Sequence, residues 1–250
     1  MMDLAMNTLL DALETGKGYY LGLSLNESEL NLIRSLVQSQ WIENIKYYAP
    51  SHWKKFNELG IANYHKLAHL LEHSLIWPLK NRIFSQDAVD VIRSTVFVKH
   101  LEDIYGQFEF ADVEGIGREE IYWRLVRPNE SSDVGPLHAD QWFWELGHGV
   151  MKPNVDRIKV WVALYCEPGL NGLRVVPDSQ KKEWRYHGEY RDGFLKPQID
   201  EDEAKLNIQL ANTKPGDAII FHDRLLHGGA LNTGQQTRVN IKFTMFVKNK

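Results

Sequence analysis

Arg157-Ile-Lys-Val-Trp-Val-Ala-Leu-Tyr-Cys166 is a largely apolar run that ends just before the turn residues Pro168 and Gly169. Its β-branched and aromatic content, followed by a turn, predicts a strand. Four other stretches are similarly rich in Val, Ile, Trp, Tyr and Phe: 120–127, 172–177, 217–222 and 238–247. Several short strands separated by Gly and Pro turns are typical of a β-sandwich or jelly roll.

The first half of the sequence has a helical pattern instead. Asn26 followed by Glu29 forms a capping box, and an apolar helix face comes after it. Further helices are predicted over 63–75 and 85–106, and a short strand over 18–25. Helices that precede strands favour a mainly β fold with helices packed on one side.

The chain shows no internal repeat and no linker, so we expect one domain over residues 1–250. Residues 1–118 would be the mainly helical support, and residues 119–250 the jelly-roll core. The longest irregular stretch, 178–203, is predicted to be either a lid or binding loop or a solvated surface excursion.

Composition limits the classes of function. Lys and Arg number 29 against 33 Asp and Glu, a net charge of −4, without the basic face that a nucleic-acid partner needs. The single cysteine, Cys166, excludes an intrachain disulfide and suits a reducing compartment. The N-terminus lacks a signal-peptide pattern, and no apolar run has membrane-spanning length. We therefore expect a cytoplasmic protein with a small-molecule partner.

The stretch Leu137-His-Ala-Asp-Gln-Trp142 contains a His-x-Asp pair, His138 and Asp140. In an extended segment, residues two apart point to the same face, so both side chains can reach one metal ion. Such a pair often arises by chance, and by itself it is a weak signal.

A third metal ligand could come from His227, which follows a predicted strand and precedes a glycine pair. Two histidines and one carboxylate form the facial triad of non-haem Fe(II) oxygenases, which leaves positions open for a bidentate oxoacid and O₂. Arg238 opens the last predicted strand, and its planar guanidinium matches the far carboxylate of 2-oxoglutarate. A lone arginine at a strand end is more often a surface residue.

The ordered set His138-x-Asp140, His227 and Arg238 resembles the phytanoyl-CoA dioxygenase family. So do the turn Lys214-Pro-Gly-Asp217 and the segment Leu173-Arg-Val-Val-Pro-Asp-Ser-Gln180, which is similar to the family's Leu-x-x-x-Pro-Gly-Ser-His. The resemblance covers roughly residues 120–247. It implies a double-stranded β-helix (jelly-roll, cupin-like) fold, Fe(II) held by His138, Asp140 and His227, and 2-oxoglutarate and O₂ as cosubstrates.

The sequence departs from the family pattern in several places, and one is the Asn171-Gly172 pair, which lies about one residue closer to Pro177 than usual. Gly229 stands where the family often has a small hydroxyl residue, and Asp178 and Gln180 replace the usual Gly and His. None of these residues is among the predicted metal ligands.

Several other residues are weaker candidates. Gln141 or Trp142 is expected to meet the substrate. Arg124 and Arg127 fall on opposite faces of one strand, and Arg124 is expected to face the barrel interior near the cosubstrate because Arg127 borders the loop. His65, His69 and His73 repeat every four residues, but a solvated helix face is favoured over a metal site. His148 and His222 are interpreted as core or neighbouring residues, and Asp223 as orienting a ligand or capping a turn.

The favoured function is hydroxylation of a small molecule with release of succinate and CO₂, as the resemblance implies. Desaturation or epimerisation is the alternative within enzymes. From a different class, the chain could be a jelly-roll binding protein with a structural or vestigial metal. The set of four residues weighs against that alternative, because a binding module does not need them together.

Overall fold

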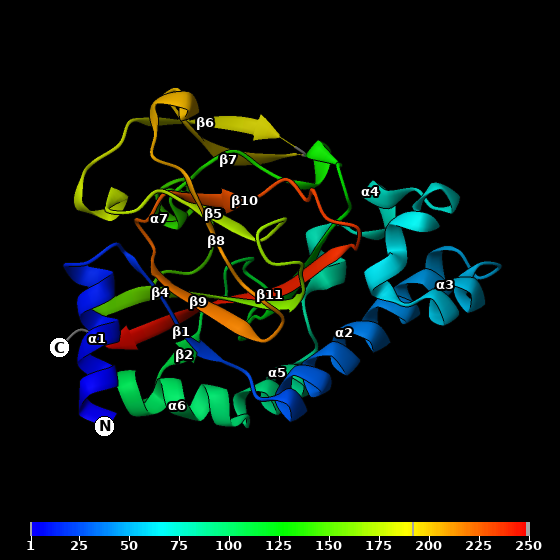
Figure 1. Ribbon diagram of the computed structural model, residues 1–250, viewed down its shortest axis with the longest axis horizontal. Helices are drawn as coiled ribbons and strands as arrows, with labels where there is room; N and C mark the ends of the chain where they lie inside the picture. The colour runs from blue at the N-terminus through cyan, green and yellow to red at the C-terminus, as the bar shows by residue number, and fades with distance from the viewer. Residues whose placement is uncertain (1, 192, 249–250) are drawn as a thin grey trace.

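The computed structural model describes residues 2–191 and 193–248. Its strands form two larger antiparallel sheets and a two-stranded hairpin, with helices along one side (Figure 1). The larger sheet has the strand order β1 (Tyr19–Ser24), β9 (Asp217–His222), β4 (Val155–Tyr165), β11 (Arg238–Lys248), β2 (Glu109–Phe110), and β3 (Tyr122–Val126) also pairs with β11. The smaller sheet has the order β10 (His227–Gly229), β5 (Leu173–Val175), β8 (Gln209–Ala211).

The predicted strands over 120–127, 157–166, 172–177, 217–222 and 238–247 are all present, as is the short strand over 18–25. The two facing sheets confirm the predicted jelly-roll class. β1 is the element that ties the N-terminal part to the larger sheet, since it pairs with β9.

Alternation along β11 separates the two sides of the larger sheet. Val239, Ile241 and Phe243 belong to the main hydrophobic core against the helices. Arg238 and Asn240 alternate with these residues, so they face the opposite side, toward the space between the sheets. The interior of the roll is therefore polar along this strand.

Helices cover the outer face of the larger sheet (Figure 1). The α-helices are α1 (Met2–Glu14), α2 (Glu27–Tyr48), α3 (Trp53–Leu59), α4 (His73–Ile76), α5 (Gln86–Arg93), α6 (Val96–Tyr105) and α7 (Asp140–Glu145). The predicted capping box is present at the start of α2: Asn26 Oδ1 accepts from Glu29 N at 2.9 Å, and Glu29 Oε2 accepts from Asn26 N at 3.0 Å.

The helix predicted over 63–75 is wrong. Two 3₁₀ turns, Ile61–Lys66 and Ala68–Leu70, precede the short helix α4. The buried Tyr64 hydroxyl bonds Nδ1 of His73 at 3.0 Å. In a straight helix, residues nine apart would lie about 13 Å apart along the axis, so the chain must fold back for this contact. The three histidines consequently do not form one helix stripe.

The single helix predicted over 85–106 is two helices. Thr95 has extended backbone angles, and its Oγ1 accepts from Val98 N at 3.3 Å, which caps α6. Ser85 caps α5 in the same way. Short hydroxyl side chains favour caps over helix interiors because they compete for backbone hydrogen bonds.

The stretch 178–203 is not irregular along its whole length. Its middle forms the hairpin of β6 (Tyr186–Arg191) and β7 (Phe194–Ile199), which lies over α7 at the top of Figure 1. Tyr186 stacks on Trp142 of α7, with ring centroids 4.6 Å apart and planes 8° apart. The hairpin is thus attached to the helix that begins at Asp140.

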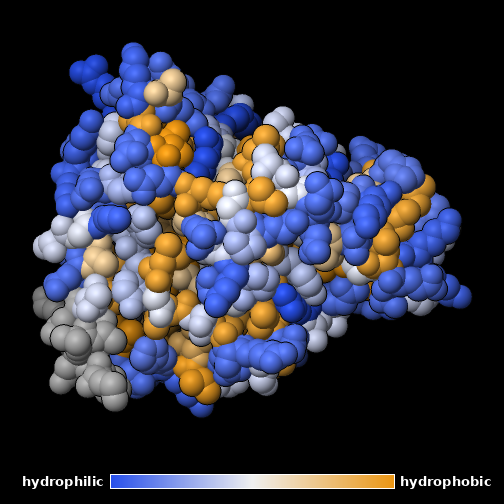
Figure 2. All heavy atoms as spheres, viewed as in Figure 1, coloured by the Kyte–Doolittle hydropathy of each residue, from blue (hydrophilic) through white to orange (hydrophobic). Residues whose placement is uncertain are grey.

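The surface mixes polar and apolar residues. On the face shown in Figure 2, hydrophobic side chains form small patches between hydrophilic ones. Among the described residues, no helix combines the length and apolar character that crossing a bilayer requires.

The helical layer should contribute strongly to stability through Trp41. This side chain is 0% exposed and makes edge contacts with Phe56 and Tyr64, at centroid distances of 6.0 and 6.3 Å. Trp41→Ala is expected to lower the free energy of unfolding by about 3–5 kcal/mol, measured by urea denaturation. Tyr47→Ala on the same helix, at a residue 79% exposed, should change it by about 0.5 kcal/mol or less. Equal losses in both variants would contradict this assignment.

Candidate metal centre

Two predicted ligands are brought together by the backbone. His138 N donates to His227 O at 3.0 Å, and His227 N donates to His138 O at 2.9 Å. Reciprocal bonds of this kind place two residues directly opposite one another with their side chains on the same face. The two imidazole rings accordingly lie with centroids 4.6 Å apart.

Asp140 completes the group from the first residue of α7. The backbone N–H of Gln141 donates to Asp223 O at 3.0 Å, which anchors the start of this helix beside β9. Asp140 Oδ2 lies 3.4 Å from His227 Nε2, and Oδ1 lies 3.9 Å from His138 Nε2. One ligand atom from each of the three residues lies within 4.8 Å of the others.

The three donors suit a divalent metal. His138 Nδ1 bonds Pro136 O at 3.0 Å, and His227 Nδ1 bonds Leu225 O at 2.9 Å. A carbonyl can only accept, so each Nδ1 carries the proton and each Nε2 presents its lone pair to the group. Asp140 Oδ2 is buried without a hydrogen bond, as expected of an atom that serves a metal ion.

The protonation states agree with this role. Burial lowers the pKa of His138 to about 4, and it also lowers the pKa of His227. Burial alone would raise the pKa of Asp140, but neighbouring positive charge, above all that of Lys159, lowers it. At neutral pH the group is therefore two neutral imidazoles and one carboxylate, which are the protonation states that bind metals.

Lys159 is a neighbour of the group that the sequence analysis missed. Its side chain is 4% exposed, and its Nζ lies 3.4 Å from Asp140 Oδ2 and 2.6 Å from Thr244 Oγ1. The sequence contains a signal for this position, because a lysine at the centre of a strand that is apolar on both faces must have a buried side chain. Its charge favours the ionised form of Asp140.

Arg238 is buried in the interior of the roll rather than exposed at a strand end. It is 2% exposed, and its Nη1 donates to Gly172 O. Its Nε has no hydrogen-bond partner, and across 2–191 and 193–248 no carboxylate lies within ion-pair distance of it. Burial, and secondarily the charge of Arg124, lowers its pKa to about 9. A buried cation without a partner is costly, which indicates that an anion binds here.

The spacing between Arg238 and the three donors can be judged from β10. A Cβ built on Gly229 would lie 3.5 Å from Arg238 Nη2, so the guanidinium lies over this glycine. Gly229 follows His227 by two residues on the same face, a separation of about 7 Å. That is roughly the length of a five-carbon dicarboxylate. The site therefore offers a metal-binding end and a carboxylate-binding end at a suitable distance.

Arg124 lies on the interior side of the strand, as expected. β3 pairs with β11 so that Arg124 is directly opposite Asn240. Its Nη2 donates to Asp133 O, and its charge adds to burial in lowering the pKa of Arg238. Arg127 instead forms a bidentate pair with Asp133, at 2.8 and 2.9 Å.

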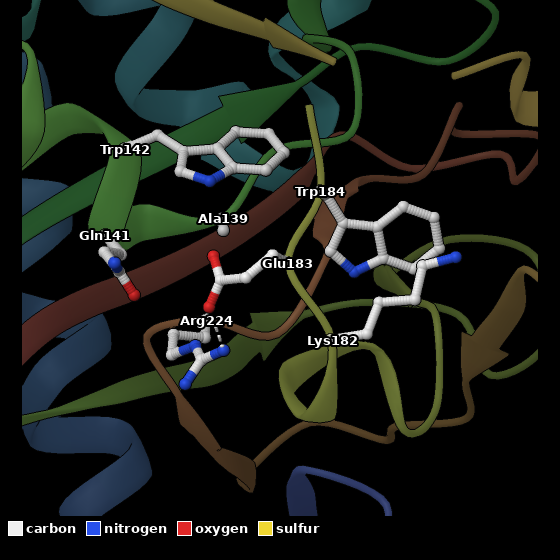
Figure 3. Close-up of a pocket in the computed structure, with 7 residues that line it drawn as sticks. All are labelled: Ala139, Gln141, Trp142, Lys182, Glu183, Trp184 and Arg224. Atoms are coloured by element: carbon white, nitrogen blue, oxygen red, sulfur yellow. Dashed lines mark hydrogen bonds and ion pairs between the residues drawn. The ribbon is translucent and has the colours of Figure 1, made fainter. Parts of the chain in front are cut away.

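Gln141 and Trp142 line a pocket that is separate from the three donors. Figure 3 shows them with Lys182, Glu183, Trp184 and Arg224, on the side of the chain to which Ala139 points. The free volume of this pocket is about 10 Å³, room for about one water. Contact of Gln141 or Trp142 with a substrate stays a prediction.

Other sequence candidates have structural contacts. His148 Nε2 bonds Leu195 O of β7 at 2.6 Å, and His222 Nδ1 lies 3.2 Å from Asp223 Oδ1. Asp178, in place of the family's glycine, has a φ of +66°, a backbone conformation that explains why glycine is usual there. Gln180 donates to the carbonyls of Leu13 and Gly16 near the end of α1.

Several solved structures share the fold. The epimerase SnoN, in complex with Fe3+, alpha ketoglutarate and nogalamycin RO, is 12% identical, with 99% of this chain and 87% of that chain covered and a TM-score of 0.57. EvdO2 from Micromonospora carbonacea var. aurantiaca is 13% identical, with 97% and 91% covered and a TM-score of 0.55. EctD from S. alaskensis, with 2-oxoglutarate and 5-hydroxyectoine, is 13% identical, with 92% and 72% covered and a TM-score of 0.54.

No curated protein matches the sequence. The family model for phytanoyl-CoA dioxygenase (PhyH), however, matches residues 47–240, which include His138, Asp140, His227 and Arg238. The match covers most of the chain and confirms the resemblance seen in its motifs. The chain belongs to the phytanoyl-CoA dioxygenase family.

Proposed function

We propose that this protein is an Fe(II)- and 2-oxoglutarate-dependent dioxygenase that hydroxylates a small molecule. The observation that carries the proposal is the combination of a buried His138, Asp140 and His227 group with a buried, unpaired Arg238. The three donors need a metal ion, and Arg238 needs an anion. One molecule of 2-oxoglutarate bound to iron would provide the anion next to the metal. Membership of the family supports the same cofactors.

Each residue has a distinct part in this proposal. His138, Asp140 and His227 would hold the iron, and the carbonyls of Pro136 and Leu225 keep the imidazoles oriented. Arg238 would pair with the far carboxylate of 2-oxoglutarate, while Arg124 adds positive charge on the same interior face. When bound, iron and 2-oxoglutarate would supply the oxidation of a C–H bond by O₂, with succinate and CO₂ released.

The surroundings of the donors would exclude water. The ring of Phe221 lies 4.6 Å from that of His227, and Trp161 lies beneath the guanidinium of Arg238, 5.9 Å from its Cζ. A dry site strengthens the ion pair between Arg238 and a carboxylate. We propose that the whole chain works as one domain, in which residues 1–118 support the jelly-roll core of residues 119–250.

Two alternatives have different outcomes. Desaturation or epimerisation would use the same residues, and SnoN, which shares the fold, is described as an epimerase. A binding protein with a structural metal would not turn over 2-oxoglutarate. The buried and unpaired Arg238 favours an enzyme, because a structural metal site has no use for it.

The test is succinate formation from 2-oxoglutarate in air with added Fe(II). We expect turnover that a chelator stops and that exceeds the rate of Asp140→Ala. The absence of iron-dependent succinate from protein that binds iron would favour the binding protein. Products analysed by mass spectrometry then separate hydroxylation, a gain of one oxygen, from desaturation, a loss of two hydrogens, and from epimerisation, which leaves the mass unchanged.

We expect hydroxylation and not halogenation. The Asp140 carboxylate occupies the coordination position that a chloride ion would need. Its side chain is 7% exposed. In chloride buffer the wild-type enzyme should give no chlorinated product detectable by mass spectrometry. A chlorinated product would show that Asp140 is not a metal ligand.

A further inference from the structure

The interior wall formed by β3 and β11 carries polar groups that the proposed iron and 2-oxoglutarate sites do not use. The strand register places Lys242 opposite Tyr122 and Asn240 opposite Arg124, so all four side chains share one face. Arg82, at the end of the 3₁₀ turn Leu79–Arg82, reaches the same region.

Arg82 is held there by two backbone carbonyls. Its Nε donates to Trp77 O at 3.1 Å, and its Nη1 donates to Trp123 O at 3.3 Å. These bonds leave Nη2 for another acceptor. Ile83, the next residue, bridges Tyr122 on one side, and Lys242 pairs with Tyr122 on the other, so the two cations flank the same residue.

Neither Lys242 nor Asn240 has its polar atoms satisfied within the protein. Lys242 Nζ lies over the ring of Tyr122, 5.1 Å from its centroid, and no described residue pairs with it. Glu114 and Glu120 act on its charge from beyond ion-pair distance. Asn240 is 1% exposed, and its Oδ1 has no hydrogen bond. A buried amide oxygen without a donor is costly, so its retention here, next to a half-buried lysine without an ion pair, indicates a ligand.

The proposed 2-oxoglutarate site does not account for these groups. Lys242 follows Arg238 by four residues on β11, about 13 Å along the strand and roughly twice the length of 2-oxoglutarate. The wall nevertheless continues to the proposed 2-oxoglutarate site, because Asn240 and its cross-strand partner Arg124 lie between Lys242 and Arg238 on the same face.

We propose that the substrate carries an oxyanion, a carboxylate or a phosphate, that binds between Lys242 and Arg82 beside the amide of Asn240. This inference rests on the proposed function, and it names the substrate class. Two cations match one oxyanion, since its oxygens accept from charged N–H groups, and Asn240 Oδ1, an acceptor, would take a hydrogen bond from an O–H or N–H group of the same substrate. The rest of the substrate would extend along Arg124 toward His138.

The experiment uses protein loaded anaerobically with Fe(II) and 2-oxoglutarate, so that Arg238 is already occupied. Acetate and inorganic phosphate are titrated separately at constant ionic strength against chloride, and the thermal unfolding midpoint is followed. We expect at least one anion to raise the midpoint of the wild type. The tighter of the two identifies the substrate as a carboxylic acid or a phosphate ester.

Lys242→Met should weaken that binding about 10- to 100-fold, because it removes a charged partner while keeping the length of the side chain. Lys205→Met removes the same charge from a side chain that is 78% exposed, and it should leave binding unchanged. Arg82→Met could fail to fold because Arg82 bonds two carbonyls, and Lys242→Met and Lys242→Gln then carry the test.

The metal-to-ligand absorption band of bound 2-oxoglutarate is recorded in the same samples. If the band forms and Lys242→Met binds the anion as tightly as the wild type does, or if neither anion binds the wild type, the inference is overturned. If the band never forms, the proposed function is contradicted instead. In that case the anion site can no longer be interpreted as a substrate site.

Discussion

Asp140→Ala and His227→Ala are expected to lose iron-dependent 2-oxoglutarate turnover completely. Each removes one of the three donors of the group, and the loss should exceed the 10- to 100-fold typical of residues that act through a ligand. Iron affinity, measured by anaerobic Fe(II) titration, should fall in parallel. His187→Ala is the matched control, because this histidine is 58% exposed and lies on the hairpin strand β6.

Folding has to be separated from metal binding in these variants. Asp140→Ala leaves the buried Lys159 with only Thr244 as a partner, so its thermal midpoint should drop. Asp140→Asn keeps the shape of the side chain and removes the charge, so it serves as a second variant. Wild-type iron affinity or turnover in a folded Asp140 or His227 variant would contradict the metal assignment.

The second large effect is expected at Arg238, which decides whether 2-oxoglutarate is used. The guanidinium is 2% exposed, so a pair with the far carboxylate would be desolvated. Removing one partner of a buried pair costs about 3–5 kcal/mol, which corresponds to a loss of about 100- to 3,000-fold in 2-oxoglutarate affinity. Arg238→Lys should be nearly as damaging as Arg238→Ala, because an ammonium cannot make the planar, paired contact.

The measurement is a 2-oxoglutarate titration, anaerobic and with Fe(II), that follows the metal-to-ligand absorption band. Iron binding should survive in both variants, since Arg238 is not among the three donors. Arg191→Ala is a suitable control, because Arg191 lies on the hairpin away from β11. If Arg238→Ala binds 2-oxoglutarate within threefold of the wild type, the cosubstrate assignment fails.

The sequence was most informative where local pattern and tertiary environment agree. β4, β9 and β11 were predicted because apolar and β-branched runs bounded by turns have few alternatives to a buried strand. The capping box at Asn26 was predicted because all its atoms lie within one turn. His138 and Asp140 were paired for the same reason, since their spacing of two residues acts locally.

Predictions from local sequence patterns were wrong where contacts between distant residues determined the backbone conformation. The region 63–75 has the apolar spacing of a helix, but the contact between Tyr64 and His73 requires a tighter path. Within 85–106, the preference of Thr95 to cap a helix ended one helix and started another. The hairpin of β6 and β7 was missed because its strands are largely exposed, so they carry little hydrophobic alternation.

What the sequence determined by itself was the class of fold, the family and the order of the residues proposed for the site. Only the tertiary structure decided that His138 bonds His227 across two strands, that Arg238 is buried without a partner, and that Lys159 lies beside Asp140. These facts depend on residues far apart in the chain, and their register is set by the packing of whole sheets. A linear pattern predicts which face of a strand a side chain occupies. The residues that this side chain contacts depend on which other strand packs against that face.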